Sequence, residues 1–128
     1  MTNINSRMKT PPSKKSAPPE DEMGALVVIA TVPDENLAVK VTAALLQQGL
    51  AACVHALPAG KSTYRWQGNV ETASEITLLI KTRSAHYAEL EAVLTRLHPY
   101  DVPEILALPV IAGLPAYLNW IMDETSKN

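Results

Sequence analysis

Residues 62–81 read STYRWQGNVETASEITLLIK and carry the clearest structural pattern in the chain. In the first arm, Ser62, Tyr64 and Trp66 alternate with other side chains at the period of two that is typical of a β-strand. Gly68 follows, and glycine readily adopts the positive φ angle that a tight reversal requires. The return arm places three aliphatic residues on one face: Ile76, Leu78 and Ile80. The stretch therefore predicts a β-hairpin.

The segments on either side of this hairpin alternate between strand and helix patterns. The expected elements, in chain order, are strand 25–32, helix 34–48, strand 53–57, the hairpin arms, helix 84–97, strand 105–111 and helix 114–121. Pro103, just before the strand near the C-terminus, and Pro109 within it predict an edge strand or one with bulges. This order predicts an α+β, ferredoxin-like β-α-β-β-α-β sheet with helices on one face and an extra C-terminal helix.

Residues that start and stop helices support these boundaries. Asp34 is expected to cap the first helix and Ser84 the second, because their side-chain oxygens accept hydrogen bonds from free backbone N–H groups. Gly49 is a natural stop for the first helix. Pro99 ends the second, because the residue before a proline is pushed out of helical geometry.

The first 24 residues differ in composition from the rest. They contain two proline pairs and few large apolar residues, so they bury too little surface to become ordered. No apolar stretch typical of a secretion signal occurs among them. We expect a disordered tail over 1–24 and one ferredoxin-like domain over 25–128.

Composition excludes several classes of function. The chain has 128 residues and a net charge of −2, so its overall field gives no attraction for nucleic acid. No apolar run is long enough to span a bilayer. Cys53 is the single cysteine, which excludes an internal disulfide and favours a cytoplasmic location.

The length of the hairpin predicts an oligomer. Arms of about 15 residues span roughly 50 Å at about 3.3 Å per residue, which exceeds the roughly 21 Å of a 14-residue helix. The far half carries apolar side chains (Tyr64, Trp66, Val70 and Ile76), and unpaired edges with such side chains attract another chain. The alternative is that the bend at 58–60 folds the hairpin back on itself.

Several motifs occur together in order: Ala51-Ala52-Cys53-Val54, Ser62-x-Tyr64-x-Trp66-x-Gly68, His98-Pro99-Tyr100-x-x-Pro103-Glu104 and Tyr117-Leu118-x-Trp120. In this combination the chain resembles the CutA divalent-cation-tolerance proteins over residues 25–128. The resemblance implies a homotrimer in which each hairpin extends a neighbour's sheet, and an association with copper and other divalent metals. It implies no established enzymatic reaction. The trimer is similar in shape to the PII signalling proteins, which sense small molecules.

His98 is the candidate metal ligand, because imidazole suits copper, zinc and nickel. Asp101 and Glu104 follow closely and could supply oxygen ligands. Alternatively, His98 ends the second helix and its ring bonds a free carbonyl there. The chain departs from some metal-linked relatives at two further ligand positions, where it has Ala30 and Leu97.

Cys53 and His55 lie two apart on a strand and face the same side, so they form a possible two-ligand pair. A small buried cysteine is the alternative interpretation of Cys53. The sequence gives no sign of a thiol nucleophile with a positioned base.

A second candidate site is a ligand pocket or packed interface between subunits. Its predicted members are Tyr64, Trp66, Lys81, Tyr100, Glu104 and Trp120. Aromatic walls with a few polar groups are typical of ligand pockets, and aromatic side chains are also enriched where subunits pack. Lys81 and Glu104 are alternatively a structural ion pair. Trp120 is alternatively a cover for the sheet.

The sequence thus predicts a trimeric divalent metal ion (copper) binding and tolerance protein, not an enzyme. The alternative is a PII-like regulatory trimer that senses a small ligand between subunits and acts through a protein partner.

Overall fold

The computed structural model describes residues 24–126, and the predicted tail lies outside them apart from Gly24. The elements are β1 (Ala25–Val32), α2 (Glu35–Gln47), β2 (Cys53–Ala56), β3 (Gly60–Trp66), β4 (Asn69–Arg83), the 3₁₀ turn η1 (Ser84–His86), α3 (Tyr87–Leu97), β5 (Ile105–Pro109) and α4 (Pro115–Glu124). Their order confirms the predicted β-α-β-β-α-β arrangement with an added C-terminal helix.

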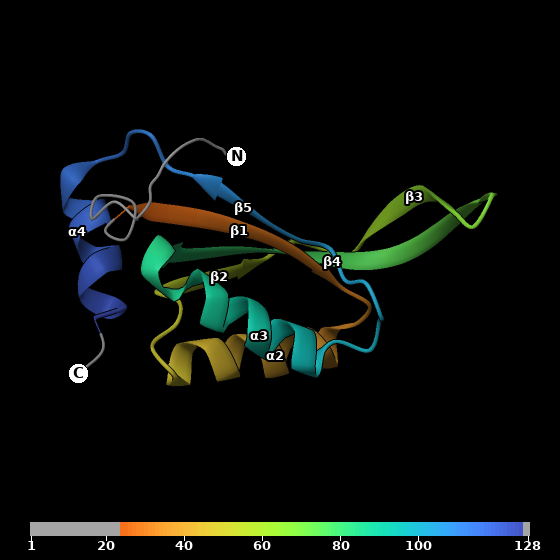
Figure 1. The fold of residues 1–128 in the computed structure, drawn as a ribbon, viewed down its shortest axis with the longest axis horizontal. Helices are drawn as coiled ribbons and strands as arrows, with labels where there is room; N and C mark the ends of the chain where they lie inside the picture. The colour runs from red at the N-terminus through yellow and green to blue at the C-terminus, as the bar shows by residue number, and fades with distance from the viewer. Residues whose placement is uncertain (1–23, 127–128) are drawn as a thin grey trace.

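The sheet is antiparallel throughout and has β4 as its longest strand. Its order is β2-β4-β1-β5, and β3 pairs with the first half of β4. β5 pairs with β1 alone within this sheet, which confirms its predicted place at an edge. The β3–β4 hairpin projects beyond the rest of the sheet and does not fold back on itself (Figure 1).

Two helices cover one face of the sheet and enclose the core. α2 and α3 lie side by side beneath it, while α4 lies at the end of the sheet away from the hairpin (Figure 1). Alternate residues of β1 face these helices and are buried: Val28, Ala30 and Val32. They pack with Leu45 of α2 and Leu94 of α3. The core is therefore aliphatic.

The two predicted helix caps have different outcomes. Asp34 caps α2 as predicted, because its Oδ1 accepts a hydrogen bond of 2.9 Å from the Leu37 N–H. Ser84 does not cap α3, which begins at Tyr87. Its backbone N–H still continues the strand pairing by donating to the Gly24 carbonyl (2.9 Å), and its buried Oγ has no hydrogen-bond partner among residues 24–126. The 3₁₀ turn over Ser84–His86 thus separates Ser84 from the first residue of α3.

Candidate functional site

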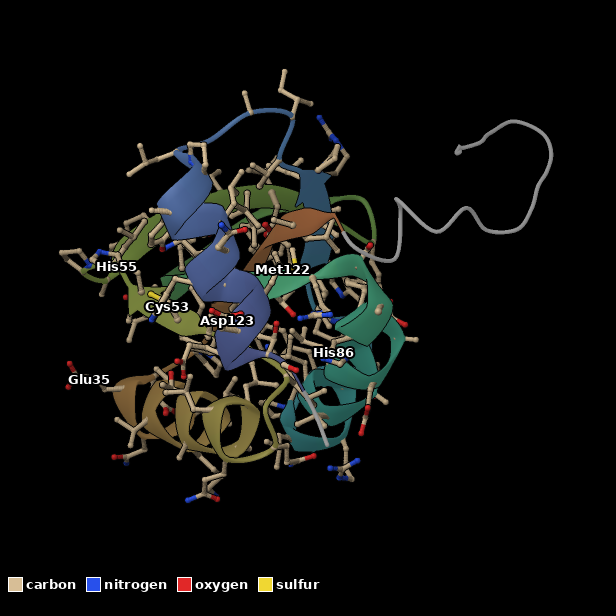
Figure 2. The ribbon with its side chains drawn as sticks, turned by 90° about the vertical axis from the view of Figure 1, so that its left-hand side faces the viewer. Glu35, Cys53, His55, His86, Met122 and Asp123 are labelled. Atoms are coloured by element: carbon tan, nitrogen blue, oxygen red, sulfur yellow. The ribbon has the colours of Figure 1, made fainter. Side chains whose placement is uncertain are left out.

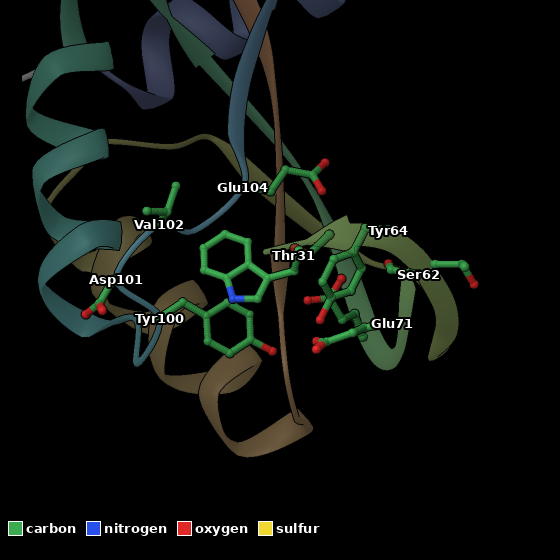
Figure 3. A pocket seen from close by; sticks show the side chains of 11 residues that line it. Thr31, Ser62, Tyr64, Glu71, Tyr100, Asp101, Val102 and Glu104 are labelled. Atoms are coloured by element: carbon green, nitrogen blue, oxygen red, sulfur yellow. The ribbon is translucent and has the colours of Figure 1, made fainter. Parts of the chain in front are cut away.

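A cavity of about 680 Å³ lies where the hairpin leaves the sheet. One wall is formed by the hairpin and the other by the loop 98–104 that joins α3 to β5, while Thr31 contributes from the end of β1 (Figure 3). The site therefore joins three segments that are far apart in sequence.

The turn at the hairpin tip sets which side chains enter the cavity. Gln67 and Gly68 both have positive φ, 50° and 85°, as a two-residue reversal requires. This turn pairs Tyr64 with Glu71, and directly opposed residues share one face of the hairpin. Glu75 lies four residues beyond Glu71 and therefore on the same face.

His98 holds the opposite wall in place. Its Nε2 lies 2.8 Å from the Thr31 carbonyl oxygen, and its Nδ1 accepts a hydrogen bond of 3.2 Å from the Tyr100 N–H. Since Nδ1 is the acceptor, the neutral ring carries its proton on Nε2 and donates it to Thr31. The ring also contacts Tyr100, with centroids 4.7 Å apart. His98 thereby fixes the loop against the end of β1.

The side chains around the cavity make it acidic. Glu71, Glu75, Asp101 and Glu104 line it, and no Lys, Arg or His of residues 24–126 does. Desolvation by burial raises the pKa of Tyr100, and the Glu75 charge, the nearby Tyr64 and a hydrogen bond to Glu75 raise it further. These effects all favour the neutral phenol, as expected in a negative environment.

Three aromatic rings border the same space and remain accessible. Tyr64, Trp66 and Tyr100 are 41%, 48% and 40% exposed. Figure 3 shows the Tyr64 and Tyr100 rings on opposite walls, with the Glu71 carboxylate pointing into the space between the walls. The cavity therefore combines carboxylates with apolar ring surfaces.

The structure brings together four of the predicted site residues: Tyr64, Trp66, Tyr100 and Glu104. The other three do not line the cavity. His98 is buried behind Tyr100, and the Trp120 ring stacks on Tyr117 in α4, with centroids 5.6 Å apart. Lys81 lies along β4, where its Nζ is 3.8 Å from the Cys53 Sγ.

The other metal-ligand candidates are arranged as follows. Cys53 is half-buried and His55 exposed on β2, at the edge of the sheet (Figure 2). Ala30 is buried in the core and Leu97 packs against the core, and neither side chain contains an atom that could bind a metal ion. Within residues 24–126, no three or more His, Cys, Asp or Glu side chains gather closely enough to hold a metal ion.

Sequence reasoning missed Glu71 and Glu75 as cavity residues. A signal for them was present, since counting outward from a two-residue turn at 67–68 pairs Tyr64 with Glu71. Nothing in the sequence pattern indicates that Thr31 and Val102 also line the cavity, because this depends on how the loop crosses the end of β1.

Comparison with known proteins gives a consistent result. The family model described as CutA1 divalent ion tolerance protein matches residues 26–124. The divalent-cation tolerance protein CutA of Thermus thermophilus is 44% identical over 99 residues, which cover 77% of this chain and 96% of that protein. The chloroplastic CutA protein of Arabidopsis thaliana is 36% identical over 122 residues, covering 95% of this chain and 64% of that protein.

Solved structures agree with these matches. The crystal structure of CutA from Xylella fastidiosa superposes with a TM-score of 0.78 at 46% identity, covering 80% of this chain and 99% of that one. Among residues 24–126, no helix has the length and apolar character needed to cross a membrane. With a matching family model over residues 26–124 and relatives of this similarity, the chain belongs to the CutA1 divalent ion tolerance protein family.

Proposed function

We propose that this chain forms a cytoplasmic homotrimer that binds divalent metal ions, copper in particular, and thereby contributes to metal tolerance. The observation that carries the proposal is the acidic cavity, which four carboxylate residues line and no Lys, Arg or His of the described part of the chain does. The names of the relatives, which refer to divalent-cation tolerance, support the same class of ligand.

The loop 98–104 is the proposed source of metal ligands. Asp101 and Glu104 offer exposed carboxylates, and His98 offers the imidazole nitrogen that copper favours. Coordination through His98 Nδ1 would replace the hydrogen bond from the Tyr100 N–H. Because a single chain does not supply three converging ligands within residues 24–126, a second copy would complete the set.

The proposed trimer is supported by the apolar face of the sheet opposite α2 and α3. Leu106 and Leu108 of β5 are 55% and 49% exposed there. They oppose Ile29 and Val27 of β1, so these four side chains form one apolar strip. An exposed apolar surface next to a projecting hairpin is typical of a protein–protein contact.

Calorimetric titration with Cu²⁺ tests the metal proposal. The double variant Asp101→Asn/Glu104→Gln is expected to bind Cu²⁺ about tenfold more weakly or worse, since even outer partners of a metal site contribute on this scale. Glu124→Gln, which removes one exposed carboxylate from α4, is the control and should retain wild-type affinity. Equal isotherms for the wild type and the double variant would reject the cavity as the metal site.

His98→Ala is a second variant for the same titration. Unchanged Cu²⁺ binding in a folded His98→Ala protein would remove His98 from the ligand set. Because His98 is buried and hydrogen-bonded through both ring nitrogens, circular dichroism must first show that this variant is folded.

The aromatic walls favour a second candidate, a PII-like regulatory trimer that senses a small organic ligand and acts through a protein partner. Rings beside a few polar groups are typical of sites for small molecules. A thermal-shift screen separates the candidates, because a ligand of the folded state raises the melting temperature. A large shift with an organic compound, and none with Cu²⁺, would favour the regulatory role.

A further inference from the structure

We propose that the cavity beneath the hairpin binds an organic cation, an alkylammonium compound whose charged groups meet the carboxylates and whose hydrocarbon body lies against the aromatic rings. This inference rests on the proposed function in one respect, since it uses the same cavity. It differs in the chemical class of the ligand.

The first argument is charge. Glu71 and Glu75 line the space from the hairpin, and Asp101 and Glu104 line it from the loop, so both walls carry acidic residues. No ion pair with a Lys or Arg of residues 24–126 neutralises these carboxylates. A positively charged ligand would relieve their mutual repulsion.

The hairpin also keeps its own cations away from this space. Lys61 and Arg65 alternate with Ser62, Tyr64 and Trp66 along β3, so their side chains leave the other face of the strand. Neither lines the cavity. The hairpin therefore has an acidic face toward the cavity and its basic residues on the opposite face. Its own cations do not neutralise the acidic face, which remains available to a ligand.

The second argument is the aromatic surface. Trp66, Tyr64 and Tyr100 present large ring areas that are 40% to 48% exposed. Ring faces attract ammonium groups and also cover methylene groups, whereas a metal ion has no hydrocarbon surface to bury against them. Rings beside carboxylates therefore favour an ammonium ion carried on a hydrocarbon chain.

The third argument is size and spacing. A volume of about 680 Å³ lies in the range of small-molecule sites, about 300–1,000 Å³. Within residues 24–126, the carboxylates do not converge in a group of three or more that could hold one ion. Spread charges in a large space match a ligand with separated charges better than a single small ion.

Titration with 1,4-diaminobutane tests the proposal, with 1,4-butanediol as the uncharged analogue of equal length and Mg²⁺ as an inorganic dication. Trp120→Phe leaves Trp66 as the single tryptophan, so its fluorescence reports events in the cavity. We expect a saturable change in Trp66 emission with the diamine and none with the diol. Matching responses to the diamine and the diol would overturn the proposal.

Two substitutions, measured by calorimetry, test the named contacts. Trp66→Leu keeps apolar volume but removes the ring face, and should raise the Kd for the diamine about threefold to thirtyfold. Glu75→Gln removes one charge and should raise it about twofold to fivefold. Glu124→Gln is the charge control and should leave it unchanged. Wild-type affinity in Trp66→Leu would overturn the proposed contact with the ring.

The same proteins distinguish this inference from the metal proposal. Cu²⁺ binding without diamine binding would overturn the organic-cation inference and leave the metal function standing. Saturable diamine binding that is weakened in Trp66→Leu, with no Cu²⁺ binding, supports the inference and rejects the metal function.

Discussion

His98 shows how one side chain can position a site without lining it. It joins the Thr31 carbonyl of β1 to the Tyr100 N–H of the loop, and it is 7% exposed. The Thr31 side chain and Tyr100 both line the cavity, so the histidine connects two of its walls.

We expect His98→Ala to lower the free energy of unfolding by about 1–3 kcal/mol, because Thr31 and Tyr100 lose hydrogen-bond partners. Urea denaturation measures this loss. His55→Ala, at an exposed histidine on β2, is the control and should change stability by less than about 0.5 kcal/mol. Equal losses in the two variants would contradict the positioning role of His98.

Tyr87 gives a prediction for alkaline pH. Burial raises its pKa from 10.0 to about 12, together with the hydrogen bond that its hydroxyl donates to Glu91 Oε2 (2.9 Å) and the Glu91 charge. In the unfolded chain the phenol loses its proton near the ordinary pKa of 10.0, while in the folded chain it keeps the proton up to about pH 12. The stabilisation by this phenol is therefore complete below pH 10 and is lost as the pH rises through about 12.

Tyr87→Phe should make the decline of stability above pH 10 shallower, because it removes this proton. Urea midpoints at about pH 9 and about pH 11 measure how steeply stability falls with pH. Glu91→Gln, which keeps a hydrogen-bond acceptor without the charge, should give an intermediate slope. A slope in Tyr87→Phe equal to that of the wild type would refute the assignment.

At the scale of elements, the tip of the hairpin determines the register of the whole acidic face. Gly68 has φ near +85°, a conformation that side-chain-bearing residues rarely adopt, and an added Cβ would meet no atom within 4 Å. The cost of a side chain there is therefore conformational and not steric.

Gly68→Ala should destabilise the protein by about 1–2 kcal/mol, the cost of placing an L-residue in the left-handed region. Gly60→Ala is a matched control, because Gly60 also has open space around it but no positive φ. It should leave the free energy of unfolding near the wild-type value. Similar thermal denaturation of the two variants would show that Gly68 does not set the turn.

At the scale of the whole molecule, the apolar strip on the open face of the sheet is the proposed contact between copies. Leu108→Glu should dissociate the proposed trimer, because a charge buried without a partner costs several kcal/mol. Sedimentation equilibrium measures the mass. Val39→Glu, at an exposed position of α2, is the control and should keep the wild-type mass. A wild type that sediments as a single subunit would reject the trimer itself.

The fold was predictable because its signals are local. Alternation in residues 62–81, the Asp34 cap and the stop at Pro99 each depend on a few neighbouring residues, and all agree with the structure. Tyr64, Trp66, Tyr100 and Glu104, which the sequence analysis places in one site, do line one cavity, and their part in binding stays a prediction. Glu71 and Glu75 were missed although the register set by the turn at 67–68 places them opposite β3, whereas Thr31 was missed because its approach depends on the path of a loop. Ser84 was wrongly predicted as a cap because a 3₁₀ turn over Ser84–His86 precedes α3.

The strand order has a consequence for how the chain is synthesised. If the sequence is divided at the hairpin tip, β1, β2 and β3 fall in the first half and β4 and β5 in the second. Each of the four strand ladders within residues 24–126 joins one half to the other. As the polypeptide leaves the ribosome, its early strands have no partner among themselves, so sheet formation must wait until β4 emerges. Translation therefore delays the folding of this sheet more than it would delay a sheet of successive hairpins.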